Sequence, residues 1–313
     1  MIYSDMMDFI TVQLPWAGET VAWPGVILLG FIVGLLSGLL GVGGGFLITP
    51  ALFVIFNIPY PYAVGSSLAQ MVGASFSGVI RHWRMGNVED KLIVSLMVGS
   101  LIGVEFGAQT IERLKLTGKL SVFGHSWNVL DVTMSIIYIL LLLWVGMMML
   151  RESRAALKRP PQGGVVSTGM SRWVQSLKWP PLITLHRSHI QALPFWIVAV
   201  TGFFGGYCSG LLGVGGGFVM VPAMIFGLGI PTTIAVGTSL LQAMLTALAG
   251  TFTHVMKNNV DWMLAGLLLL GTATGVHPGA LLTSKIRGAH IRLVFSVVTL
   301  ITALGIALKV VLG

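Results

Sequence analysis

Two serine–glutamine pairs occur with the same spacing in separate parts of the chain. Ser67 and Gln70 are three residues apart, and so are Ser239 and Gln242. This spacing places both members of a pair on one face of a helix. Hydroxyl and amide groups in an apolar segment need hydrogen-bond partners. Each pair therefore bonds either to a neighbouring helix or to a polar ligand such as a small anion, and the duplication of both pairs favours the ligand.

A glycine-rich run precedes each pair. Residues 37–46 read SGLLGVGGGF, and residues 209–218 repeat these ten letters. The apolar stretch after the first run, residues 46–58, would form a helix of roughly 20 Å, which is short of the ~30 Å bilayer core. Such a helix begins inside the membrane, where its first N–H groups and its dipole favour an anion. The glycines predicted to bind the anion are Gly43, Gly44, Gly45, Gly215, Gly216 and Gly217.

Other uses of a glycine-rich run are weaker here. Close helix packing through small residues is one, but three consecutive glycines exceed what close approach needs. A phosphate-binding P-loop is excluded because neither Lys-Ser nor Lys-Thr follows the glycines, and a dinucleotide fingerprint lacks its strand and its acidic residue. The glycine surplus, 41 residues in all, makes the two runs the best candidates for the site.

The composition requires that membrane helices position these residues. The chain is 55% hydrophobic and 9% charged, whereas about a quarter of the residues in soluble domains are charged. Its apolar stretches are continuous rather than alternating, which predicts helices and not the strands of a barrel. These stretches cover residues 21–40, 46–58, 62–80, 92–110, 132–150, 195–212, 218–230, 232–253, 262–284 and 291–312.

An internal repeat organises the whole chain. An offset of 172 positions, which takes Ser37 to Ser209, also aligns Ile58-Pro59 with Ile230-Pro231 and His82 with His254. Duplicated halves with glycine-interrupted segments are typical of secondary transporters. The chain is therefore predicted to be all-α and polytopic. Its predicted parts are a non-cytoplasmic segment 1–20, repeat 1 at 21–150, a basic linker 151–190 and repeat 2 at 191–313.

The relative orientation of the repeats depends on the number of crossings. Five segments per half, an odd number, predict inverted repeats whose glycine-broken helices meet near the membrane midplane. Counting each broken pair as one crossing would make the halves parallel. Inversion places 13 Lys and Arg residues on the linker side against 5 on the other, which fits the positive-inside rule better. The linker carries six of the eight net positive charges, and we expect it in the cytoplasm near anionic lipid rather than nucleic acid.

Several polar residues outside the pairs are candidates for anion guidance or proton coupling. Glu105 lies within an apolar segment and corresponds to His277 in the repeat. Either could carry a proton, although Glu105 could equally be an interfacial residue. Arg81 is either a membrane anchor or a guide for an anion, and His82 and His254 end equivalent helices.

The sequence offers little for enzymatic or metal chemistry. The single cysteine, Cys208, excludes a disulfide framework and a zinc cluster. Only His186 and His189 have a metal-like spacing, and they lie in the linker. No enzyme activity, metal site or cofactor is therefore expected.

These motifs resemble those of a known family. The duplicated GLLGVGGGF followed by a proline, the segments Val64–Leu68 and Val236–Leu240, and the ends at His82-Trp83 and His254 are similar to the TauE/SafE family of sulfite and organosulfonate exporters. The resemblance implies a multi-pass protein of the bacterial inner membrane type that exports small anions such as sulfite, sulfoacetate or thiosulfate. An anion channel and an uptake permease for thiosulfate are the alternatives. The direction, the coupling ion and the oligomeric state, including a homo-oligomer, stay open.

Overall fold

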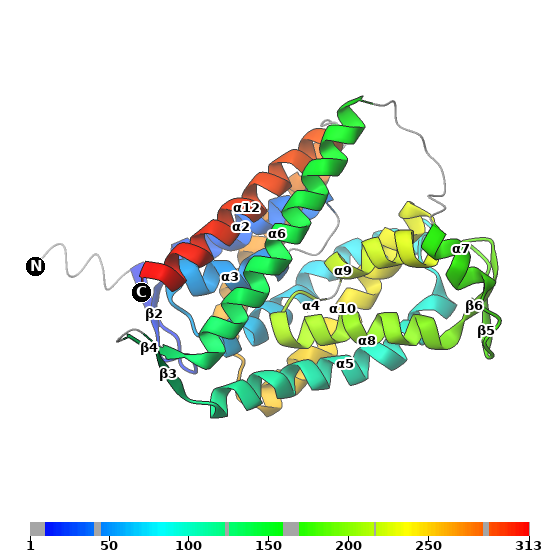
Figure 1. Ribbon diagram of the computed structural model, residues 1–313. Coiled ribbons are helices and arrows are strands. Elements are labelled where there is room, and N and C mark those ends of the chain that lie inside the picture. The colour runs from blue at the N-terminus through cyan, green and yellow to red at the C-terminus, as the bar shows by residue number, and fades with distance from the viewer. Residues whose placement is uncertain are drawn as a thin grey trace, which may run out of the picture.

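The protein is a bundle of helices, with short β-hairpins at its ends (Figure 1). A computed structural model describes residues 10–40, 45–122, 125–158, 169–215, 217–283 and 288–312. Among them, five helices are long and apolar enough to cross a membrane. They are α4 (Tyr60–Arg84), α5 (Asp90–Leu116), the Val129–Arg151 part of α6 (Val129–Lys158), α8 (Phe195–Leu212) and α10 (Thr232–Met256). The predicted all-α polytopic class is confirmed.

The remaining elements complete the two halves. The other helices are α2 (Trp23–Leu40), α3 (Gly45–Phe56), α7 (Gly169–Ser176), α9 (Gly217–Pro222), the π-helix η1 (Ala223–Leu228), α11 (Trp262–Thr283) and α12 (Gly288–Leu312). Three antiparallel hairpins join β1 (Thr11–Gln13) to β2 (Thr20–Ala22), β3 (Lys119–Val122) to β4 (His125–Asn128), and β5 (Leu182–Leu185) to β6 (Ile190–Pro194). The sequence did not predict these hairpins.

The sequence repeat is also a structural repeat. The 172-residue offset carries both ends of α2 onto those of α8, and both ends of α4 onto those of α10. It carries α3 onto α9 and η1 together, so the second half has a π-helix where the first half is regular α-helix. The hairpins β1–β2 and β5–β6 precede α2 and α8 in the same way.

The two halves run in opposite directions. A Cβ atom at Gly65, near the start of α4, would meet the backbone of Asn259, just after α10. A Cβ atom at Gly237, near the start of α10, would meet the backbone of Asn87, just after α4. The two helices are therefore antiparallel. We call the end with α7 and β5–β6 the linker end and the end with β1–β2 the terminal end (Figure 1).

Each glycine-broken pair enters and leaves the bundle at the same end. Helix α2 starts at the terminal end and runs parallel to α11, since Gly271 packs on Ile27 and Gly279 packs on Leu35. Helix α3 then returns to the terminal end, where α4 begins. Helix α8 and its partner α9–η1 do the same from the linker end. The pairs are helical hairpins that dip in from opposite ends, and the single-crossing count that made the halves parallel is wrong.

Glycine ladders join the helices of one half to those of the other. Helix α5 packs on α8, and α11 packs on α2, so closely that a Cβ atom at Gly103 would collide with the carbonyl of Phe203. Small residues four apart allow this approach. The ladders consist of Gly99, Gly103 and Gly107 on α5, Gly202, Gly206 and Gly210 on α8, Gly30, Gly34 and Gly38 on α2, and Gly271, Gly275 and Gly279 on α11. Much of the glycine surplus therefore serves packing and not the breaks.

Candidate functional site

The start of α3 meets the second glycine break inside the bundle. Gly45, the first residue of α3, lies so close to the second break that a Cβ atom there would be 2.9 Å from the Gly213 carbonyl oxygen. The same atom would be 3.1 Å from Sδ of Met71, which also packs on Gly215. Met71 is near the middle of α4, so the start of α3 meets the second break near the centre of the bundle. The predicted ligands Gly43, Gly44 and Gly216 lie outside the described residues.

The second break depends on glycine geometry. Gly213 and Gly215 have φ values of 69° and 67°, a left-handed conformation that glycine adopts without steric cost. Gly213 ends α8, and Gly217 starts α9. Because Gly45 begins α3, the negative end of the α8 dipole faces the positive end of the α3 dipole. The break thus brings polar backbone into an otherwise apolar interior.

The two predicted serines hold the helices around the breaks. Ser67 Oγ lies 2.9 Å from the Val64 carbonyl oxygen and 3.2 Å from that of Gly213 in the opposite half. It also lies 2.8 Å from Oγ1 of Thr49. Ser239 Oγ donates to the Val236 carbonyl at 3.0 Å. The position equivalent to Thr49 is a valine, so the two halves offer different polar groups at their serines.

Each predicted glutamine is anchored by the opposite half. The hydroxyl of Thr272 on α11 donates to Oε1 of Gln70 at 3.0 Å. The Nε2 group of Gln242 donates to the hydroxyl of Ser100 on α5 at 2.9 Å. Ser100 and Thr272 are themselves related by the 172-residue offset. The two contacts therefore join repeat-related residues, but the hydroxyl is the donor in the contact with Gln70 and the acceptor in the contact with Gln242.

Both glutamines keep one polar atom without a partner. Gln70 is 1% exposed and Gln242 is fully buried. Within the described part of the chain, Gln70 Nε2 and Gln242 Oε1 have no hydrogen-bond partner. A buried polar group left unsatisfied costs about 1–3 kcal/mol. These two atoms are therefore the strongest structural indication that something polar binds between the helices.

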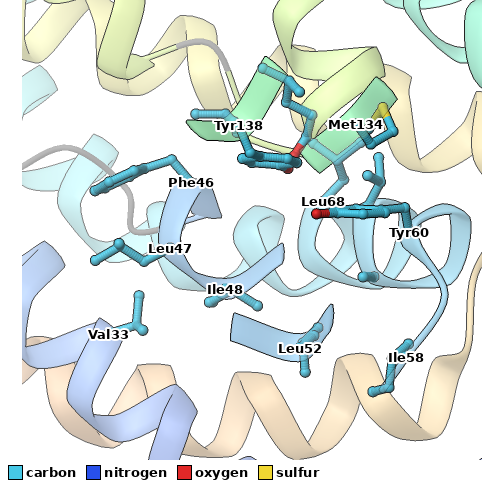
Figure 2. Close-up of a cluster of buried hydrophobic side chains, with 14 of the residues drawn as sticks. Val33, Phe46, Leu47, Ile48, Leu52, Ile58, Tyr60, Leu68, Met134 and Tyr138 are labelled. Carbon is cyan, nitrogen blue, oxygen red and sulfur yellow. The ribbon is translucent and has the colours of Figure 1, made fainter. Parts of the chain in front are cut away.

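A tyrosine of α6 contacts the second break and stacks on a tyrosine of α4. The hydroxyl of Tyr138 donates to the carbonyl of Leu212, the last residue of α8. Its ring stacks on that of Tyr60 with the centroids 5.7 Å apart, within the cluster shown in Figure 2. The sequence did not indicate Tyr138, because only the first part of α6 overlaps α12 at the repeat offset, and the residue there that corresponds to Tyr138 is Val310. Tyr138 is the contact by which α6 reaches the break.

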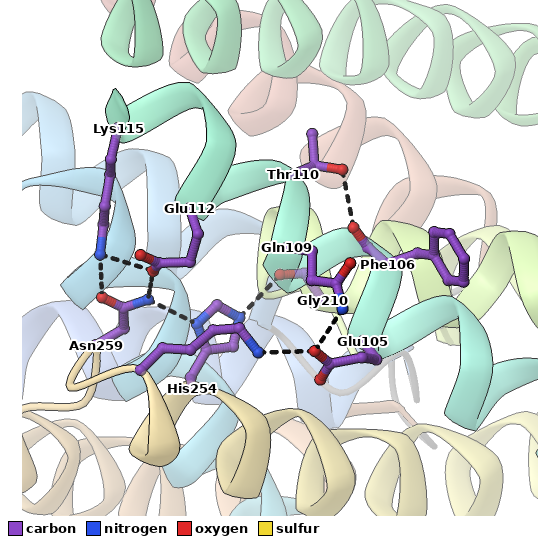
Figure 3. A network of polar contacts seen from close by, with 10 residues as sticks. Glu105, Phe106, Gln109, Thr110, Glu112, Lys115, Gly210, His254 and Asn259 are labelled. Carbon is purple, nitrogen blue, oxygen red and sulfur yellow. Dashed lines mark hydrogen bonds and ion pairs between the residues drawn. The ribbon is translucent and has the colours of Figure 1, made fainter. Parts of the chain in front are cut away.

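A polar network joins the end of α10 to α5 and α8 (Figure 3). His254 is fully buried, and its Nε2 lies 2.9 Å from the carbonyl of Gly210, in the last turn of α8. Asn259, which lies 3.5 Å from Nδ1 of His254, donates to Glu112 at 2.7 Å. Glu105 pairs with Lys257 at 2.9 Å. Of the residues predicted to couple protons, the structure thus brings His254 and Glu105 into one network next to the second break.

The other candidates for anion guidance do not join this network. Arg81 is exposed in the last turn of α4. His82 has no partner for its Nδ1 atom among the described residues. His277 is exposed on α11, with its Nδ1 atom 2.9 Å from the Ala273 carbonyl. Arg81 and His277 are therefore surface residues, whereas His82 is half-buried.

Two buried acids, which the sequence did not indicate, hold the β-hairpins that precede α2 and α8. Asp261 accepts hydrogen bonds from the backbone N–H groups of Trp16 and Ala17 in the β1–β2 turn, at 3.0 and 3.2 Å. Glu89 accepts from the N–H groups of Arg187 and Ser188 in the β5–β6 turn, at 2.9 and 3.0 Å. The two acids are 172 positions apart, so the repeat offset itself could have revealed them. No group of residues suited to a metal ion is present in the described ranges.

Comparisons with known proteins settle the family. The profile of the family described as "Sulfite exporter TauE/SafE" matches residues 26–306. The chain belongs to the TauE/SafE family. It is 25% identical to the probable membrane transporter protein YunE of Bacillus subtilis over 284 residues, which cover 88% of this chain and 94% of that protein.

Other TauE/SafE relatives carry similar names. The chain is 27% identical to the probable membrane transporter protein YjnA of Bacillus subtilis over 279 residues, covering 89% of this chain and 97% of the relative. It is 25% identical to the probable membrane transporter protein MJ0441 of Methanocaldococcus jannaschii over 287 residues, covering 87% and 91%. No solved structure matches the chain significantly. The protein is thus a membrane transporter and not an enzyme.

Proposed function

We propose that this TauE/SafE protein is a secondary transporter that exports a small sulfur-containing anion, such as sulfite or an organosulfonate, across the cell membrane. The observation that carries the proposal is the pair of half-satisfied glutamines beside two glycine breaks that meet inside an inverted bundle. Inverted repeats with a site at their interface are the architecture of alternating access. The family description, sulfite exporter, supports the class of substrate.

In this proposal the anion accepts a hydrogen bond from the free Nε2 group of Gln70, and a protonated oxygen of the same anion donates to the free Oε1 atom of Gln242. Backbone N–H groups around Gly43–Gly45 and Gly215–Gly217, with Ser67, Gln70, Ser239 and Gln242, replace its hydration shell. Dipoles and amides provide the attraction, so the anion is not held by a buried full charge and can be released. The two halves then rotate relative to each other about the antiparallel helices α4 and α10, which exposes the site to one side of the membrane at a time.

The decisive test is to remove the two amides. Replacing Gln70 and Gln242 with leucine should abolish the binding of sulfite to purified protein, measured by calorimetry, while the thermal unfolding transition is kept. Leucine has a similar volume, so the packing is retained and only the polar groups are lost. Gln109→Leu is the matched control, because Gln109 bonds to Glu105 on the outer part of α5. Wild-type affinity in the double variant would exclude this site.

Liposome flux separates the transporter from a channel. A transporter gives flux that saturates with sulfite concentration and responds to an imposed ion gradient. We expect the linker end to face the cytoplasm, with outward flux favoured from that side. Flux that rises linearly with concentration, without response to any gradient, would favour an anion channel.

A further inference from the structure

The linker end carries a cap that is fastened to the second helical hairpin. The cap consists of α7 and the β5–β6 hairpin. Ser171 and Val174 of α7 are buried, and Nε2 of Gln175 donates to the carbonyl of Leu228, the last residue of η1, at 2.8 Å. The side chains of Ser171 and Gln175 also lie against Gly229, the left-handed residue that ends η1. The cap therefore holds the end at which the second hairpin leaves the bundle.

A second attachment ties the same cap to the first half. The buried carboxylate of Glu89, in the turn between α4 and α5, accepts the N–H groups of Arg187 and Ser188. The Ser188 hydroxyl donates to the same oxygen at 3.2 Å. The N–H of Glu89 in turn donates to Thr238 on α10 at 3.0 Å. A force on the cap is thus transmitted to both halves of the bundle.

The outer face of the cap has the chemistry of a segment at a lipid surface. Met170, Trp173 and Trp179 are 63%, 61% and 61% exposed. Basic residues stand beside them, and all are exposed: Arg172, Lys178 and Arg187. Residues 169–194 include no Asp or Glu. Exposed tryptophans beside basic residues suit the headgroup region of a bilayer, where Lys and Arg side chains attract anionic lipid.

The equivalent hairpin of the first half has no basic residues. The β1–β2 hairpin that corresponds to β5–β6 contains Glu19 and no Lys or Arg, and residues 1–10 before it contain Asp5 and Asp8. Anionic lipid at the linker end would therefore act on one helical hairpin and not on its repeat-related copy. Charge complementarity thus favours anionic lipid as the partner and the linker end as the side on which it acts.

We propose that anionic phospholipid headgroups bind the outer face of the cap. They thereby hold the second helical hairpin, α8 with α9 and η1, in the position that this structure shows. The lipid contacts the basic residues and tryptophans of the cap. The cap passes this restraint to η1 through the Gln175–Leu228 hydrogen bond. This regulation is separate from the identity of the transported anion, because none of the cap residues lies near the glycine breaks.

The test measures how accessible the second hairpin is, without any substrate. Position 227, in η1, has no atom within 4 Å of where a Cβ would lie, so Gly227→Cys should fit there in a Cys208→Ser background. The protein is placed in nanodiscs of phosphatidylcholine, with or without phosphatidylglycerol, and labelled with an uncharged maleimide. We expect labelling about fivefold slower with phosphatidylglycerol, the effect of a modest coupling between two sites.

Two matched controls make the result specific. Ile55→Cys lies at the equivalent position of α3, where there is no cap, and its labelling should not depend on the lipid. Combining Arg172→Gln, Lys178→Gln and Arg187→Gln should remove the lipid effect at position 227. Arg113→Gln with Lys119→Gln, exposed at the terminal end, should retain it. Equal labelling in both lipids, or an equal change at position 55, would overturn the proposal, whether or not sulfite is the substrate.

Discussion

At the scale of single residues, Ser100 sets the orientation of the Gln242 amide. Its hydroxyl donates to the Gly202 carbonyl at 3.0 Å. Its proton is therefore committed, and Ser100 can only accept a hydrogen bond from Gln242. The glutamine must then turn its Nε2 group toward Ser100 and its Oε1 atom away. The free atom of Gln242 is thus a consequence of the contact between α5 and α8.

Replacing Ser100 with alanine tests this role. The variant leaves the buried Nε2 group without its acceptor, so we expect sulfite affinity to fall about tenfold, in line with the loss of one buried hydrogen bond. Ser100→Thr should restore binding, because the equivalent position of the other half is Thr272. Calorimetry on the two purified variants gives the comparison. Full affinity in the alanine variant would show that Gln242 needs no anchor.

Asp261 is predicted to matter for stability rather than for binding. Asp261→Ala removes the acceptor of three backbone N–H groups, those of Trp16, Ala17 and Leu264. Hydrogen bonds to charged groups contribute about 1.5–3 kcal/mol each, so the free energy of unfolding should fall by roughly 3 kcal/mol or more. Unfolding in detergent, followed by circular dichroism, measures this loss.

The matched control for Asp261 is an exposed acid. Asp90 lies on the surface in the first turn of α5, where its charge contributes at most about 1 kcal/mol. Asp90→Ala should therefore cost much less than Asp261→Ala. Similar losses from both variants would contradict a special role for the hairpin contact.

At the scale of elements, the glycine ladders fix how closely the two halves approach. A Cβ atom at Gly103 would meet the backbone of α8, whereas Gly266 on α11 is exposed and has open space around it. Gly103→Ala should separate α5 from α8 and lower the unfolding temperature or the yield of folded protein. Gly266→Ala should stabilise the helix by about 0.5–1 kcal/mol. Thermal unfolding of both variants tests the pair, and no difference between them would argue against the ladder.

The sequence predicted the long elements well for a physical reason. Lipid requires continuous apolar helices, so each apolar stretch marks a helix, and the ends agree to within two turns except at α6, which continues eight residues beyond the predicted end at 150. The ladders were not predicted because their glycines are not contiguous. They stand at every fourth position of α2, α5, α8 and α11, a spacing that forms one stripe only once the chain is helical. The β-hairpins were missed because strands of three to five residues leave hardly any periodic signal.

The candidate site was predicted only in part. The duplicated Ser67–Gln70 and Ser239–Gln242 pairs do lie on the helices beside the breaks, because duplication preserves spacing. Their anchors are far away in sequence: Ser100 is 142 positions from Gln242, and Thr272 is 202 positions from Gln70. No local motif marks either anchor. Tyr138 corresponds to Val310 at the repeat offset, so no duplicated motif marks it and only three-dimensional packing could reveal its contact with the second break.

At the scale of the whole molecule, neither half contains a complete site. Gln70 is anchored by α11 and Gln242 by α5, so each half supplies what the other lacks. A chain divided into fragments 1–158 and 159–313 should bind sulfite only when both fragments are made together. Affinity capture of one tagged fragment, followed by calorimetry, measures this. The second fragment keeps the basic residues after position 158, which we expect to orient it in the membrane.

Two versions of the fragment experiment give a clear contrast. Fragments carrying Ser100→Ala in the first half should reassemble but bind weakly, whereas fragments carrying Gly103→Ala should fail to reassemble. Binding by either fragment alone would contradict a site shared between the halves.

The reciprocal anchoring of the two glutamines also bears on the ancestry of the chain. A single half could anchor its glutamine in this way only by pairing with an antiparallel copy of itself, which is the arrangement that the two halves of the chain reproduce. In such a dimer both copies change together. Once fused, the copies could diverge: serine stands at position 100 and threonine at 272, methionine at 71 and alanine at 243, and threonine at 49 and valine at 221. Fusion thus allowed the entrance and the exit of one path to evolve separately.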